Sequence, residues 1–172
     1  MGLLKDLFCP DPVQMQPTMP QISTVMTNRN ISDILSGTMR PIQVKRIVLR
    51  PYEECLFCDY AVLITEKLQV VGRQGNGGNF TFRIMKGMYY HTGNRGQTVI
   101  RDKVPEYFKG KLYITNKRIV FSADNKAFQN DLSSLISYRE EDGCLILQFS
   151  RSCYRIYLPV VSCADKVLSY VL

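Results

Sequence analysis

The sequence predicts a mainly β (β+α) protein: a bent antiparallel barrel or sandwich of about seven strands, closed by a C-terminal helix. Two observations support this fold class. Short runs rich in β-branched and aromatic residues recur from residue 44 onward, and clusters of Gly, Asn, Asp and Pro separate them. The last segment changes to helical spacing. A chain of 172 residues is also long enough to bury one core without disulfides.

The N-terminal 40 residues differ from the rest of the chain. Residues 10–20 contain four prolines and no apolar periodicity, which predicts an extended linker. Residues 28–37 predict one short helix, with Asn30 as its N-cap and Gly37 as its end. We therefore expect an arm, linker and short helix over residues 1–40, and a single β-rich domain over residues 41–172.

Eleven short runs in this domain have strand chemistry. They cover residues 44–49, 55–65, 68–72, 80–85, 88–92, 111–115, 118–122, 127–132, 135–139, 144–149 and 153–158. Turn signals at 115–117, 124–126 and 142–143 predict tight antiparallel hairpins. After them, Ala164, Val167, Leu168 and Val171 recur at helical spacing, and Ser162 with Asp165 suggests a capping box.

The run from Gly110 to Phe121, GKLYITNKRIVF, followed by Asn130-Asp131-Leu132 and Leu135-Ile136-Ser137-Tyr138, resembles the centre of GRAM and related pleckstrin-homology-like (PH-like) domains. Among these it is most similar to small bacterial PH-like proteins of unknown function. The resemblance implies that residues 41–172 form a PH-like or GRAM-like domain and that the protein is a binding module, not a catalyst. Fold alone does not assign function, and no basic phosphoinositide-binding motif matches residue by residue.

Composition indicates the class of partner and the compartment. The formal net charge is +7 and the isoelectric point is near 9.2, which favours anionic partners. The apolar runs are shorter than the ~20 residues that a membrane-spanning helix needs. The N-terminus does not match a secretory signal, so we expect a cytoplasmic protein, with peripheral membrane attachment left open. The six cysteines are then expected to be reduced thiols.

The usual signatures of catalysis do not occur in the sequence. Cys55-x-x-Cys58 has a spacing typical of metal or redox sites, but residues three apart on a strand point to opposite faces, which favours buried thiols. A metal site completed by Cys144, Cys153 or Cys163 is left open. His91 is the only histidine and has no matching nucleophile motif. We therefore predict no catalytic residue, no metal and no cofactor.

The candidate interface lies in a basic, glycine-rich stretch. Residues 72–79 match no phosphate-binding loop and predict a hairpin tip, where Arg73 and Asn76 could contact a partner. Arg95, Arg101 and Lys103 follow in the same part of the sequence, and a membrane-facing patch requires these arginines and Lys103 to share one face with Arg73.

Two functional hypotheses follow. The first is a non-enzymatic adaptor that docks on a protein partner or an anionic membrane surface. The alternative is a phage- or mobile-element-encoded inhibitor that binds a host protein or nucleoprotein complex, with the proline-rich arm inserted into its target. Binding to nucleic acid remains open, and an exposed edge strand would permit a homodimer.

Overall fold

A computed structural model describes the main chain of residues 19–75, 80–85, 88–90 and 97–172, and the side chains of residues 19–68 and 103–172. The described chain forms two compact units. Unit 1 contains the described part of residues 66–105, and unit 2 contains residues 19–65 and 106–172. The elements in chain order are α1 (Asn28–Leu35), β1 (Cys55–Gly75), β2 (Phe80–Met85), β3 (Met88–Tyr90), β4 (Gln97–Thr115), β5 (Arg118–Ala123), β6 (Ala127–Asp131), a 3-10 turn (Leu132–Ser134), β7 (Leu135–Glu141), β8 (Cys144–Phe149), β9 (Cys153–Tyr157) and α2 (Val161–Val171).

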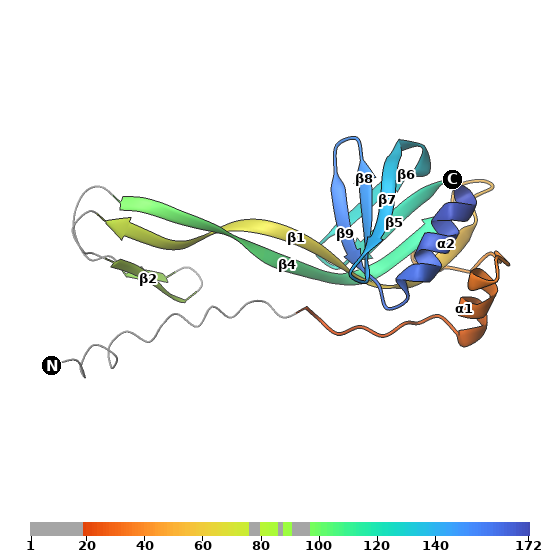
Figure 1. Cartoon of the computed structure of the whole chain (residues 1–172), viewed down its shortest axis with the longest axis horizontal. Helices are drawn as coiled ribbons and strands as arrows, with labels where there is room; N and C mark the ends of the chain where they lie inside the picture. The colour runs from red at the N-terminus through yellow and green to blue at the C-terminus, as the bar shows by residue number, and fades with distance from the viewer. Residues whose placement is uncertain (1–18, 76–79, 86–87, 91–96) are drawn as a thin grey trace. The chain divides into compact units, whose positions relative to one another are not determined.

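Unit 2 is built on a seven-stranded sheet with the order β6-β5-β4-β1-β9-β8-β7. The neighbours whose register is defined pair antiparallel, and α2 follows the last strand. Strands β4 to β6 and β7 to β9 are two meanders, and β1 joins them by pairing with β4 on one side and β9 on the other. This arrangement confirms the predicted fold class, an antiparallel sheet of seven strands closed by a C-terminal helix (Figure 1).

The sheet of unit 2 is folded over so that its two meanders face each other. The ring of Phe128 on β6 stacks on that of Tyr154 on β9, with centroids 3.8 Å apart, although three strands separate β6 from β9 in the sheet. The space between them is filled by apolar side chains that alternate along each strand. Phe57, Ile114, Phe121, Leu147 and Ile156 are all fully buried there.

Helix α2 covers this core, and α1 packs on α2 (Figure 1). Ala164, Val167 and Leu168 of α2 are fully buried, which confirms the apolar face that the spacing predicts. The predicted capping box is wrong: the helix begins at Val161, and its N-cap Val160 makes no side-chain cap bond. Ser162 therefore lies one residue inside the helix, where it cannot cap the first turn.

Helix α1 begins earlier than the sequence predicts and ends where it predicts. Thr27, not Asn30, is the N-cap, and its hydroxyl accepts a hydrogen bond from the Asn30 amide at 3.2 Å. Gly37 has a φ of +87°; its amide donates to the Ile34 carbonyl and the amide of Thr38 to that of Asp33. These two bonds are a Schellman motif, which explains why a glycine ends this helix.

The three predicted turns are confirmed, and each joins neighbouring strands. Asp142 and Gly143 both have positive φ, at 52° and 71°, as a two-residue turn of the I′ type requires. At Gly110, opposite Ala123, a Cβ atom would collide with the Ser122 carbonyl oxygen, so the glycine of the GKLYITNKRIVF run permits close strand approach.

Three strand predictions need correction. Residues 44–49 form no strand, and the Val48 carbonyl accepts a hydrogen bond from the Arg118 side chain and not from a neighbouring strand. Residues 55–65 and 68–72 belong to one strand, β1, since the polar residues between them do not interrupt its pairing. Residues 97–110, which have a charged and proline-containing sequence, form most of β4.

The described part of unit 1 consists of the C-terminal part of β1, the N-terminal part of β4, and strands β2 and β3. Strand β2 pairs antiparallel with the end of β1, with Arg73 opposite Thr81, and with β3, with Arg83 opposite Tyr89. Within this unit the ammonium of Lys103 lies 3.0 Å from a carboxylate oxygen of Glu66. None of the helices that the structure describes is long and apolar enough to cross a bilayer.

Candidate binding surface

An irregular segment, residues 44–54, crosses the outer face of the sheet of unit 2; we call it the strap. Its apolar side chains Val44, Ile47 and Leu49 point inward and are partly buried. They pack on a small outer cluster formed by Cys55, Tyr113 and Val120, with Cys58 beside it. The residues between them point away from the cluster, so the strap has one apolar face and one exposed face.

A buried ion pair fixes the strap to strand β5. The Nε of Arg118 donates to Glu53 Oε1 at 2.7 Å, its Nη2 donates to the Val48 carbonyl at 2.6 Å, and its Nη1 donates to Gln129 Oε1. Glu53 also accepts from the Thr115 hydroxyl at 2.8 Å and from the Arg50 amide at 2.6 Å. Every nitrogen of the guanidinium that can donate and both oxygens of the carboxylate are therefore used.

These contacts change the acidity of Glu53. Burial acts to raise its pKa, but the hydrogen bonds from Arg118, the Arg50 amide and Thr115, with the positive charge of Arg118, outweigh burial. The pKa of Glu53 therefore lies below its ordinary value of 4.5, and the ion pair persists at neutral pH.

The turn between β4 and β5 also binds the strap, on both sides of Glu53. Asn116 Oδ1 accepts from the Glu54 amide at 3.0 Å, and its Nδ2 donates to the Tyr52 carbonyl at 3.2 Å. The ammonium of Lys117 donates to the Pro51 carbonyl at 2.7 Å. The Thr-Asn-Lys-Arg sequence at 115–118 is thus more than a turn signal: all four side chains bind the strap.

As a result, the strap presents two large hydrophobic side chains to solvent. Val48 is 90% exposed and Tyr52 is 93% exposed. Tyr52 also has a φ of +60°, a left-handed conformation that costs a bulky residue on the order of 1–3 kcal/mol. Sequence reasoning missed this feature, because residues 44–49 have the pattern of a strand; the Pro51-Tyr52 pair was the available turn signal.

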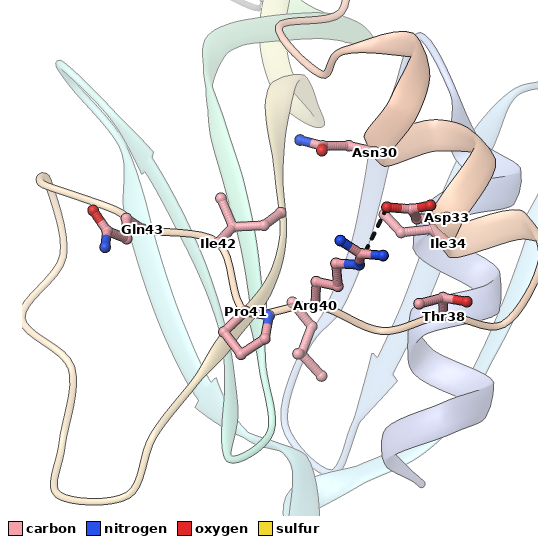
Figure 2. Close-up of a pocket in the computed structure, with 9 residues that line it drawn as sticks. Asn30, Asp33, Ile34, Thr38, Arg40, Pro41, Ile42 and Gln43 are labelled. Carbon is pink, nitrogen blue, oxygen red and sulfur yellow. Dashed lines mark ion pairs between the residues drawn. The ribbon is translucent and has the colours of Figure 1, made fainter.

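A hollow lies beside α1, with a volume of about 290 Å³. Its floor includes Ile34 and Leu56, both buried, and Figure 2 shows the Arg40 side chain reaching toward Asp33 at its edge. The Nε of Arg40 lies 3.4 Å from Asp33 Oδ2, so the two charges compensate each other. A larger hollow of about 460 Å³ lies between residues 46–48 of the strap and strands β5 and β6.

Basic side chains also lie on the outer face of β4. The ammonium groups of Lys109 and Lys111 lie 5.9 Å and 4.9 Å from the ring centroid of Tyr60 on β1. At these distances the ring attracts both cations, and it holds two positive charges on this face of unit 2.

The predicted interface residues fall largely outside the described side chains. The main chain of Arg73 lies in β1 and that of Arg101 in β4, both within unit 1, but the structure does not describe their side chains. Asn76 and Arg95 lie outside the described residues altogether. Lys103 is exposed and pairs with Glu66. Whether these residues share one face therefore remains a prediction.

The cysteine pair behaves differently from the strand argument. Cys55 belongs to the outer cluster and Cys58 packs against it, because Leu56 and Phe57 both lie in the inner core, so the alternation of faces along β1 begins only at Phe57. Burial, with smaller effects from Cys58 and Glu53, raises the pKa of the Cys55 thiol to about 12, and its Sγ donates to the Phe57 carbonyl at 3.2 Å. Among the described residues, no group of three or more His, Cys, Asp or Glu is placed to hold a metal ion. His91 lies outside the described residues.

The chain is similar to the Vps36 N-terminal PH domain, with 15% sequence identity over 72% of this chain and 83% of that chain, and a TM-score of 0.42. No family model matches the sequence. No curated protein matches it either.

Proposed function

We propose that this protein is a non-enzymatic binding module that docks on an anionic membrane surface, and that the stretch 66–105 makes the first contact. The observation that carries the proposal is the distribution of charge. This stretch of 40 residues has seven Lys or Arg against two Asp or Glu, a formal net charge of +5 out of +7 for the whole chain. A cationic segment gains on the order of 1 kcal/mol for each Lys or Arg placed near an anionic lipid surface.

The composition of the same stretch supports a contact role. It holds seven of the eleven glycines of the chain, and aromatic and β-branched residues occur between its basic residues. Strands β1 and β4 both continue into it from the sheet of unit 2, so it is tied to a folded domain at both ends. We assign the anion contacts to Arg73, Asn76, Arg95, Arg101 and Lys103. The GRAM-like and bacterial character suggested by residues 110–121 remains part of this proposal.

The test is co-sedimentation of the purified full chain with phosphatidylcholine vesicles, with and without phosphatidylserine, at low and near-physiological salt. We expect binding to the anionic vesicles alone, and weaker binding as salt screens exposed charge. Absence of binding to phosphatidylserine vesicles at low salt would overturn the membrane proposal. If the chain bound an acidic protein and not lipid, the result would support an adaptor that docks on a protein partner. If it bound nucleic acid, the result would support the alternative, an inhibitor of a host nucleoprotein complex.

A matched pair of variants tests the location of the contact. Replacing Arg73, Arg95 and Arg101 together by Gln should lower the vesicle partition coefficient roughly ten- to hundredfold at low salt. Replacing Arg29, Arg151 and Lys166 by Gln changes the net charge equally but alters only exposed residues of unit 2. Equal losses for the two triple variants would show that only net charge matters and that 66–105 is not the contact.

A further inference from the structure

The strap of unit 2 carries two unusually exposed hydrophobic side chains. Val48 and Tyr52 are 90% and 93% exposed, whereas the six other exposed large hydrophobic residues that the structure describes are 45–66% exposed. Single exposed hydrophobic residues are ordinary on protein surfaces. Two such side chains on one short segment, almost free of contact with their own protein, are not explained by packing.

The main chain at both residues is fixed by hydrogen bonds from side chains of the domain. The carbonyl of Val48 accepts a hydrogen bond from the buried Arg118, and the carbonyl of Tyr52 accepts one from Asn116. Between them, Lys117 binds the carbonyl of Pro51. The φ of +60° at Tyr52 is maintained by these bonds, although the side chain itself contributes almost no packing. Strain of this kind persists where the surrounding structure imposes it, and it often accompanies a functional role.

The surroundings of the two side chains are cationic. Lys45, Arg46, Arg50 and Lys117 are exposed on the strap and the adjoining turn, against the exposed carboxylates of Glu54 and Asp131. Arg50 pairs with Asp131 at 2.9 Å, and Glu53 is buried with Arg118, so the balance of exposed charge is positive. A partner surface that complements this part of the strap is anionic and accommodates two protruding hydrophobic side chains.

We propose that Val48 and Tyr52 insert into the interfacial region of an anionic bilayer while the flanking cations contact lipid headgroups. This inference rests on the proposed docking function and adds an apolar anchor to it. A tyrosine ring is suited to the headgroup level, where one end is apolar and the other is hydrated. Two protruding side chains suit a deformable lipid surface better than a protein interface, which usually buries about 800 Å² on each partner.

The chain contains no tryptophan, so a single introduced tryptophan reports on its own position. In the Tyr52→Trp variant, we expect the fluorescence emission to shift to shorter wavelength on adding phosphatidylserine-containing vesicles, and brominated lipid to quench it. The matched control is Tyr170→Trp, which replaces a tyrosine that is 63% exposed on α2. Its emission should remain unchanged when the protein is bound.

A loss-of-binding experiment complements the fluorescence. Tyr52→Ser and Val48→Ser should each lower the partition coefficient roughly threefold to tenfold, because each removes part of an apolar side chain that becomes buried. The loss should persist at near-physiological salt, where charge contributes less. Tyr170→Ser is the control and should bind as the unaltered chain does.

The outcomes separate this inference from the proposed function. If the unaltered chain binds anionic vesicles but the emission of the Tyr52→Trp variant neither shifts nor is quenched, the strap does not insert and the inference is wrong, while docking through 66–105 stands. If the unaltered chain does not bind, both fail. If the shift and quenching in the Tyr52→Trp variant survive the triple Gln replacement in 66–105, the anchor is supported and the assignment of the first contact is contradicted.

Discussion

The two faces of the sheet in unit 2 are covered in different ways. The inner face is filled by apolar side chains from β1, β4, β5, β8, β9 and α2, many of them fully buried. The outer cluster of Cys55, Tyr113 and Val120 is covered by an irregular strap, and polar bonds from Glu53 and Arg118 hold that strap in place. Apolar packing therefore forms the fold, whereas a hydrogen-bonded network shapes the strap that carries the proposed apolar anchor.

The largest expected effect comes from the inner face. Phe121 on β5 is fully buried in the core, and its ring centroid lies 5.7 Å from that of Phe128. Phe121→Ala should lower the free energy of unfolding by about 3–5 kcal/mol, because it removes buried apolar surface and leaves a cavity. Urea denaturation measures this change. Ile136→Ala, at a position that is 66% exposed, is the control and should change stability by less than about 0.5 kcal/mol.

A smaller effect is expected from the network on the outer face. Glu53→Gln keeps the shape of the side chain but leaves Arg118 without its counter-charge, so we expect a loss of about 1–3 kcal/mol. Trypsin should also cleave faster after Lys45 and Arg46, because the strap opens more often than the core. Glu54→Gln is the matched control, since Glu54 is exposed and uses only main-chain groups in its bonds with Asn116.

The same network predicts a pH dependence. The pKa of Glu53 is lower in the folded chain than its ordinary value of 4.5, so the folded state binds this proton less readily than the unfolded state does. Its contribution is therefore complete above about pH 4.5 and is lost as pH falls through the folded pKa. The unaltered chain should lose more stability than Glu53→Gln between about pH 5 and about pH 3. Parallel losses in both proteins would show that Glu53 contributes nothing to acid unfolding.

The contrast between the two faces also explains what the sequence could predict. The apolar residues of β5 and β8 alternate or cluster locally, and the Asp142-Gly143 turn has a recognisable type, so strands and hairpins are readable from short windows. The strap depends on Arg118 finding Glu53 across 65 residues of sequence. No local pattern encodes that contact, and the strand-like composition of residues 44–49 therefore predicts the wrong structure.

The candidate site was predictable to a smaller extent than the fold. Net charge and glycine content locate the basic stretch 66–105 from sequence alone, but which of its arginines share a face depends on strand register and on side-chain direction. The exposure of Tyr52 could not be predicted, because Pro51 indicates a turn but does not determine whether the neighbouring tyrosine ring packs on the domain or faces solvent.

The smallest effect on stability is expected at Tyr52 itself, and its sign distinguishes a presented side chain from a packed one. Glycine adopts a φ of +60° without strain, and a side chain that is 93% exposed has little packing to lose. Tyr52→Gly should therefore leave stability unchanged or raise it by up to about 1 kcal/mol, since relief of strain offsets the greater freedom of the unfolded chain. The same variant should lose vesicle binding as Tyr52→Ser does. A destabilisation of more than about 1 kcal/mol in urea would mean that Tyr52 supports the strap by packing, and a binding loss could then no longer be attributed to insertion. Unchanged stability together with weaker binding would show that the strained tyrosine serves the surface and not the fold.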